Sequence, residues 1–302
     1  MRTPQFRTDD NSDAPLSGQA SVDDLVELLN LSQVDDLRFT GQNPPLGPMR
    51  VYGGQVAAQA LVAAGRTVDP KRMVHSLHGY FVRSGDPTEP IEYHVERIRD
   101  GRSFSVRRSV AQQGGKTIFF MSASFHLQEK GLDHHDPAPE VPGPEEVPTL
   151  ADLIAHYPER IEIWKLMPRP FDVRYLDEPG WLRPGDRAAN PQNRVWMRVD
   201  GKLPDDPLLH ACMLTYASDM TLLDSVLSVH GEVWGPGGVI GASLDHAVWF
   251  HRPFRADEWF LYDCTSPTAS GGRGLATGRM FTRDGRHIGT AVQEGLLRRV
   301  GA

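Results

Sequence analysis

The chain has 302 residues, a length typical of two domains, and 39% of them are hydrophobic while 24% are charged. This composition is sufficient for a buried core and excludes disorder over most of the length. The 32 Lys and Arg residues against 39 Asp and Glu residues give a net charge of −7, which argues against nucleic acid as a partner. The two cysteines, Cys212 and Cys264, are far apart and exclude a disulfide framework and a Cys-rich zinc site.

No apolar run approaches the roughly 20 residues that span a bilayer. Residues 1–20 lack the apolar segment of a secretory signal, and residues 299–302 do not match a peroxisomal address. We therefore expect no membrane span and a cytoplasmic location.

The pattern of the first half predicts helices followed by an antiparallel sheet. Residues 1–20 are polar and predict a disordered tail, and Ser21 is placed to cap a helix with one apolar face. The Ala-rich segment 55–64, which ends at Gly65, predicts a buried helix. From residue 74 to 128 apolar and polar residues alternate, and the Asp100-Gly101 and Gly114-Gly115 pairs predict hairpin turns. Residues 21–128 are therefore predicted to form one folded unit.

Residues 129–149 contain five prolines among acidic residues and predict an extended linker. Residues 150–302 then repeat the plan of the first half. One long helix is predicted at Pro207–Val229. Strands are predicted at residues 171–176, 195–199, 243–253, 258–264, 274–281 and 287–297, with a turn at Asp284-Gly285.

The two halves match at a nearly constant offset. Residues 81–83 (Phe-Val-Arg) correspond to residues 250–252 (Phe-His-Arg) at an offset of 169, and Gly115 corresponds to Gly285 at an offset of 170. A repeat of this length predicts two copies of one α+β unit rather than a solenoid.

Asp219 is the residue of the second half whose position is hardest to explain by packing. It lies on the apolar stripe of the predicted helix, between Tyr216 and Leu223, where a carboxylate is costly unless it is paired, protonated or used in chemistry. The alternative is that Ser218-Asp219 caps a helix that begins at Met220. By pattern alone both interpretations stay open, and Gln293 and Ser243 are ordinary strand residues.

Other motifs are weaker. Residues 133–136 (Asp-His-His-Asp) have metal-ligand chemistry, but a solvated tract is the simpler interpretation in an acidic, proline-rich linker. Residues 241–245 lack the last glycine of a nucleophile elbow. The glycine-rich segment 271–274 precedes a strand and therefore does not match a dinucleotide fingerprint. We expect neither a metal nor a cofactor.

Five separated segments resemble the acyl-CoA thioesterase II family, the double-hotdog thioesterases. They are residues 51–56 (VYGGQV), 75–81 (HSLHGYF), 216–219 (YASD), 244–254 (LDHAVWFHRPF) and 292–295 (VQEG). They occur in the family's order, and the similarity extends from about residue 22 to 298. The resemblance implies an α+β double hotdog, two tandem helix-wrapped antiparallel sheets, one from each half, with residues 150–302 as the second.

The resemblance also implies the activity, which is hydrolysis of acyl-CoA to a fatty acid and CoA by direct attack of water. The family's Asp, Gln and hydroxyl residue correspond to Asp219, Gln293 and Ser243, with Ser where some members have Thr. The first half has Gly54-Gln55 where the second has Ser218-Asp219, so one catalytic site per chain is implied.

The remaining expectations concern substrate and partners. Arg83, Arg252 and Arg273 are candidates for the CoA phosphates. Gly54 and His246 are further candidates for substrate contact, although the pattern around His246 alone is typical of packed strand residues. The resemblance implies a homo-oligomer, a dimer or a tetramer.

Two other functions stay open. One is a non-catalytic acyl-CoA-binding or sensing protein of the same fold. The other is a hotdog enoyl-CoA hydratase, for which His210 and Asp219 on the same predicted helix are the available residues, although they lie on different faces.

Overall fold

The computed structural model describes residues 17–44, 50–157, 169–179, 192–235 and 237–299. Within this part of the chain the helices are α1 (Gln19–Leu29), α2 (Gly53–Gly65), α3 (Leu150–Ile154), α5 (Pro207–Ser218) and α6 (Asp224–His230), with a short 3-10 turn, η1 (Pro144–Glu146). The strands are β1 (Ser32–Gln33), β2 (Arg38–Gly41), β3 (Arg72–Phe81), β4 (Ile91–Asp100), β5 (Phe104–Gln113), β6 (Lys116–Leu127), β7 (Phe171–Tyr175), β8 (Gln192–Val199), β9 (Val239–Ser243), β10 (Asp245–Phe250), β11 (Phe260–Ser270), β12 (Arg273–Thr282) and β13 (His287–Arg299).

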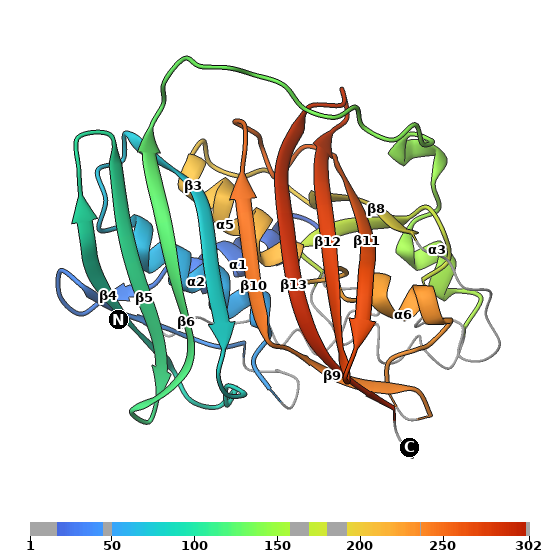
Figure 1. The fold of residues 1–302 in the computed structure, drawn as a ribbon, viewed down its shortest axis with the longest axis horizontal. Helices are drawn as coiled ribbons and strands as arrows, with labels where there is room; N and C mark the ends of the chain where they lie inside the picture. The colour runs from blue at the N-terminus through green and yellow to red at the C-terminus, as the bar shows by residue number, and fades with distance from the viewer. Residues whose placement is uncertain (1–16, 45–49, 158–168, 180–191, 236, 300–302) are drawn as a thin grey trace.

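These described strands form one antiparallel sheet with α1, α2, α5 and α6 on one face (Figure 1). The order is β1-β2-β4-β5-β6-β3-β10-β13-β12-β11-β8-β7, and β9 pairs with the end of β13. The two halves of the chain meet where β3 pairs with β10, with Leu77 opposite Val248. Each half of the sheet therefore comes from one half of the sequence, which is the arrangement expected of two tandem α+β units.

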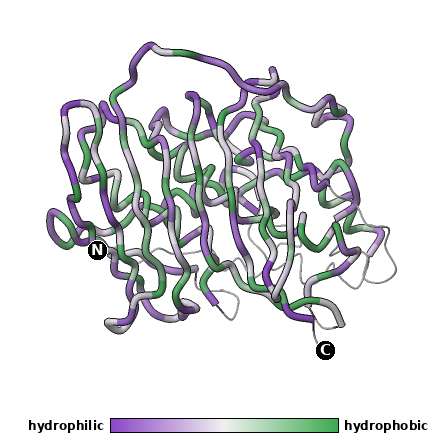
Figure 2. Tube along the Cα trace, in the orientation of Figure 1, coloured by the Kyte–Doolittle hydropathy of each residue, from purple (hydrophilic) through white to green (hydrophobic). Residues whose placement is uncertain are grey.

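The sequence patterns explain why these elements form. The hydropathy alternates along many of the strands (Figure 2), so that one face of the sheet packs on the helices. Helix α2 is buried along its length because small alanines let it lie close to β3–β6. Its one central polar residue, Gln59, is satisfied, since it accepts a hydrogen bond from the Tyr93 hydroxyl at 2.7 Å and donates to the Leu28 carbonyl at 2.7 Å.

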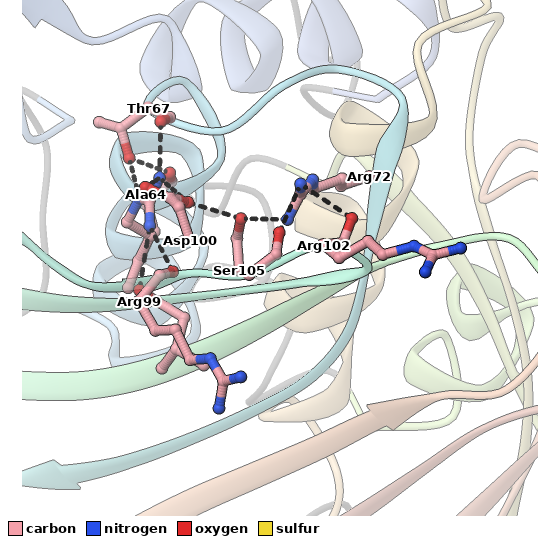
Figure 3. A network of polar contacts seen from close by, with 10 residues as sticks. Ala64, Thr67, Arg72, Arg99, Asp100, Arg102 and Ser105 are labelled. Carbon is pink, nitrogen blue, oxygen red and sulfur yellow. Dashed lines mark hydrogen bonds and ion pairs between the residues drawn. The ribbon is translucent and has the colours of Figure 1, made fainter.

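A buried arginine fixes the C-terminal end of α2. Arg107 on β5 is 2% exposed and donates to the side-chain and backbone oxygens of Thr67, just beyond the helix. It also pairs with Asp100 at 2.8 Å, which accepts in turn from Ser105 (Figure 3). The network satisfies an arginine that burial would otherwise make costly.

The linker is ordered, and it packs on the second half of the sheet. Residues 129–149 form no helix or strand apart from η1, and part of the segment packs on the sheet face opposite the helices. Val147 joins a small core with Trp196, Leu261 and Phe281, and the Trp196 indole donates to the Pro142 carbonyl at 2.9 Å. The linker is therefore a strap over β8, β11 and β12.

Three local predictions were wrong. Ser21 does not cap α1, because the helix begins earlier, at Gln19, and Ser21 is buried inside it. The continuous helix expected at Pro207–Val229 is broken between α5 and α6. The strand expected at residues 243–253 is interrupted at Leu244, which separates β9 from β10. Residues 1–16 of the expected tail lie outside the described residues.

Candidate active site

Asp219 lies at the break between α5 and α6. It caps the C-terminal end of α5 with φ −89° and ψ −7°. Its carboxyl oxygen Oδ1 accepts a hydrogen bond from the Gln293 amide nitrogen at 2.6 Å and one from the Ser243 hydroxyl at 3.4 Å. The structure therefore brings together three residues that are 24 to 74 positions apart in the sequence.

The sheet places Gln293 and Ser243 side by side. Ser243 on β9 pairs with Gly295 on β13, two residues along from Gln293, so both side chains face the helices. Because an ionised carboxylate only accepts hydrogen bonds, the amide nitrogen of Gln293 faces Asp219 and its oxygen points away. That oxygen is buried and has no hydrogen-bond partner among the described residues.

The N-terminus of α2 lies against Asp219 from the other half of the chain. The backbone N–H of Gly54 donates to the carboxyl group. A Cβ on Gly53 would lie 2.8 Å from Asp219 Oδ2 and 3.0 Å from the Phe81 ring, so only glycine leaves room for this approach. The Tyr52 hydroxyl donates to the Tyr216 carbonyl at 2.8 Å, which ties the start of α2 to the end of α5.

Burial raises the pKa of Asp219 to about 6, although hydrogen bonds from Gln293, Gly54 and Ser243 and the charge of Arg50 act to lower it. Asp219 is half-buried and lines a cleft. A carboxylate with this pKa is ionised at pH 7 and remains basic enough to accept a proton, which is the property of a general base.

A cleft of about 910 Å³ opens onto Asp219 and Ser243. Its walls combine apolar side chains from both halves, among them Phe81, Phe119, Leu223 and Leu296. Cations also line it, namely Arg50, Arg83 and Arg298. The cleft therefore fits an apolar chain and an anionic group at once.

The other sequence candidates fall into two groups. Arg83 lines the cleft and donates to the Thr117 carbonyl at 2.7 Å, and the Gly54 amide reaches Asp219. By contrast, Arg252, Arg273 and His246 are not among the described residues that line the cleft.

Each of the three residues outside the cleft has a partner of its own. Arg252 bonds to Asp133 of the strap and to the His287 carbonyl. Arg273 pairs with Glu294 at 3.0 Å. His246 is buried and contacts Ser218.

The sequence pattern does not mark Arg50, and Tyr52 and Gly53 stand out only as part of a family motif. The sequence signal for Tyr52 and Gly53 was the motif at residues 51–56. Its tyrosine and paired glycines lie where α2 begins, beside the site. Nothing local marks Arg50, because its place beside Asp219 results from the tertiary structure.

No group of three or more His, Cys, Asp or Glu residues with metal-binding geometry occurs in the described ranges. Asp133 of the Asp-His-His-Asp tract instead pairs with Arg252.

Comparisons with known proteins show the family of this chain. A family described as acyl-CoA thioesterase matches residues 170–296, and one described as the acyl-CoA thioesterase N-terminal domain matches residues 40–126. Acyl-coenzyme A thioesterase 8 of Rattus norvegicus is 39% identical over 99% of this chain and 97% of its own length. The chain belongs to the acyl-CoA thioesterase family.

Solved structures place this thioesterase among the hotdog folds. The crystal structure of acyl-CoA thioesterase II TesB2 from Mycobacterium marinum has a TM-score of 0.75 at 42% identity and covers 92% of this chain and 98% of its own. A hot dog fold protein from Alicyclobacillus acidocaldarius, 20% identical, covers 91% of this chain and 97% of its own at a TM-score of 0.73, which supports the fold alone. The double-hotdog α+β prediction is confirmed, and the chain is a thioester hydrolase. None of the described helices is long and apolar enough to span a membrane.

Proposed function

We propose that this thioesterase hydrolyses acyl-CoA by direct attack of a water molecule that Asp219 activates. The observation that carries the proposal is the hydrogen-bonded group of Asp219, Gln293 and Ser243, of which Asp219 and Ser243 line a cleft with apolar and cationic walls and Gln293 is buried behind them. The group contains an acid with a pKa near 6 and two side chains that orient it.

The chemistry proceeds in two steps. Asp219 takes a proton from water as the water oxygen attacks the thioester carbonyl carbon, a role typically worth about 10²–10⁴ in rate. Gln293 and Ser243 hold the carboxylate and the water in the direction of attack. The tetrahedral intermediate then loses the thiolate, which takes the proton from Asp219, so that the fatty acid and CoA leave.

The N-terminus of α2 supplies positive polarity where the carbonyl oxygen gains charge. The first residues of a helix carry backbone N–H groups without partners inside the helix, and these stabilise an oxyanion. Gly53 at this terminus lines the cleft beside Asp219. We therefore assign to this end of α2 the stabilisation of the negative charge that develops on the thioester carbonyl oxygen.

The lining of the cleft matches the two parts of an acyl-CoA. The apolar walls accommodate the acyl chain, and Arg50, Arg83 and Arg298 are placed for the phosphates of CoA. Arg252 and Arg273 are less suited to this role, since each already pairs with a carboxylate away from the cleft.

The deciding experiment measures thiol release from a series of acyl-CoAs, short to long, by the wild type and by Asp219→Asn. We expect wild-type activity and a loss of at least ~10² in kcat in the variant, because the substitution removes the base and conserves its shape. Binding of a thioether analogue of acyl-CoA should be retained. Full activity of Asp219→Asn would refute the role of Asp219.

The same experiment separates the alternatives. Tight binding without thiol release by the wild type would favour an acyl-CoA sensor. The hydratase alternative needs His210 and Asp219 to act as a pair. The buried His210 instead accepts a hydrogen bond from the Ala256 amide at 3.0 Å. The domain limits at residues 128 and 149, the cytoplasmic location and the dimer or tetramer stay predictions.

A further inference from the structure

A buried pair of side chains lies directly behind Asp219 and takes no part in the proposed chemistry. The ring of His246 on β10 contacts the hydroxyl of Ser218, the last residue of α5, with His246 Nε2 and Ser218 Oγ 2.7 Å apart. His246 is fully buried and Ser218 is 1% exposed. The residue next to Ser218 in the chain is the proposed base.

The hydrogen-bond network assigns the proton on the histidine ring. The Ser218 hydroxyl donates its one hydrogen to the Thr215 carbonyl at 2.9 Å. It therefore accepts from His246, so Nε2 carries the hydrogen and Nδ1 does not. Nδ1 is buried without a partner in the described structure, and burial lowers the pKa of His246 to about 4, so the ring is neutral at pH 7.

A second strand holds the backbone of the same serine. The hydroxyl of Tyr262 on β11 donates to the Ser218 carbonyl at 2.9 Å, and both groups are buried. A carbonyl in the last turn of a helix has no partner within the helix. Tyr262 supplies the hydrogen-bond donor that the Ser218 carbonyl needs at the end of α5. The side chain and the backbone of Ser218 are thus fixed to two different strands.

The register of the sheet connects these contacts to the rest of the site. His246 lies one residue beyond the Ala247–Val292 pair of β10 and β13, which places it beside Gln293. The strand pair that carries Gln293 therefore also holds the end of α5. These contacts therefore connect the residue before Asp219 to the strand pair that carries Gln293.

We propose that His246, protonated on Nε2, acts with Tyr262 as a positioning residue that fixes Asp219 against Gln293 and Ser243. The inference rests on the proposed function of Asp219 and goes beyond it. The sequence predicted that His246 contacts the substrate. The positioning role replaces that prediction, because His246 is not among the described residues that line the cleft.

The test compares His246→Leu, which removes the donor, with His246→Gln, whose amide nitrogen can replace Nε2–H. We expect His246→Leu to lower kcat about 10- to 100-fold with KM within about twofold of wild type, since small misplacements of a catalytic group have effects of this size. His246→Gln should restore most of the loss. Tyr262→Phe, which removes one oxygen atom, should also lower kcat. This variant tests the proposal if His246→Leu does not fold.

A double-mutant comparison separates positioning from general damage. In the Asp219→Asn background, His246→Leu should cause no further loss of kcat, because the group it positions is already absent. The proposal is overturned if His246→Leu retains full activity, if His246→Gln does no better than His246→Leu, or if the loss is equally large in the Asp219→Asn background. Undiminished activity of Asp219→Asn alone would refute the proposed function instead.

Discussion

At the scale of single residues, burial and hydrogen bonding act on the carboxyl group of Asp219 in opposite directions. Burial favours the protonated form, whereas Gln293, Gly54 and Ser243 each donate a hydrogen bond that favours the charged form. Burial has the larger effect, and the pKa settles at about 6. The group is consequently a stronger base than a surface aspartate and is still ionised at pH 7.

This pKa predicts the pH dependence of the rate. A general base is active only when ionised, so kcat/KM should rise with pH through an apparent pKa of about 6 and level off above it. A pH–rate profile from pH 4.5 to 8 measures this limb. A flat profile across pH 6 would contradict the assignment.

Stability measurements provide a check without substrate. Because the pKa of Asp219 is higher in the folded state than its ordinary value of 3.8, the folded state binds the proton more tightly. This group therefore lowers stability as pH rises from about 4 to 6, by about 2 kcal/mol after allowance for solvent in the cleft. Asp219→Asn should accordingly gain stability relative to wild type as pH rises, which urea unfolding at pH 4 and pH 7 measures.

Ser243 tests whether the hydroxyl group or only the packing matters. Ser243→Thr keeps the hydroxyl and should be nearly silent, whereas Ser243→Ala should lower kcat about tenfold, less than Asp219→Asn, since its hydrogen bond to Asp219 is long at 3.4 Å. Because this hydroxyl lowers the pKa of Asp219, the alanine variant should also move the acid limb to higher pH. Equal losses in Ser243→Thr and Ser243→Ala would show that packing decides.

At the scale of elements, the break between α5 and α6 determines what Asp219 does. The apolar stripe from Leu209 to Leu227 is continuous in helical spacing, and the sequence pattern therefore predicts one helix. Of the two interpretations left open, a cap for a helix that begins at Met220 is wrong, because Asp219 lies at the C-terminal end of α5 and the next helix, α6, begins at Asp224. At the break, Ser218 contacts His246 on β10 and Tyr262 on β11, and no local spacing encodes these contacts.

The position of α2 depends on Arg107 at the opposite end from the site. Arg107→Met should destabilise the fold by about 2–4 kcal/mol, because it leaves buried oxygens of Thr67 and Arg99 without donors. Since α2 then loses its C-terminal anchor, activity should fall as well. Urea unfolding and thiol release measure the two effects.

Arg99→Met is the matched control for this change. Arg99 lies on the neighbouring strand with an exposed side chain, and its substitution removes the same charge while its backbone carbonyl remains. We expect a change in stability within about 0.5 kcal/mol. Equal effects of the two substitutions would indicate that net charge, not the Arg107 network, matters.

At the scale of the whole molecule, two similar units share one proposed site. The first half has Gly54-Gln55 at the repeat position of Ser218-Asp219, and Gln55 is buried and bonded to Asn43 at 2.9 Å. Instead of an acid, the first half contributes the N-terminus of α2 and part of the cleft wall. The repeat therefore builds a single site from unequal contributions.

One site per chain predicts the stoichiometry of binding. Calorimetric titration with a non-hydrolysable thioether analogue of acyl-CoA should give one molecule bound per chain. Asp219→Asn should give the same value, because the cleft remains intact. Two molecules per chain would contradict the single site.

The amino-acid sequence by itself determined the two α+β units, the buried α2, most strands and their turns, and Gly114, Gly115 and Gly285 have the positive φ that hairpin turns favour. Periodicity and turn chemistry are local, so these features are readable along the chain. The family motifs also predicted Asp219, Ser243 and Gln293 as the site residues, and the structure brings these three together.

Only the tertiary structure decided where those motifs meet. The helix break at Asp219, the strand interruption at Leu244, the strap over β8, β11 and β12, and the arginines of the cleft all depend on contacts between distant segments. The pKa of Asp219 is the clearest case. It results from burial and from donors on α2, β9 and β13, and these surround the carboxyl group only after the whole sheet has assembled.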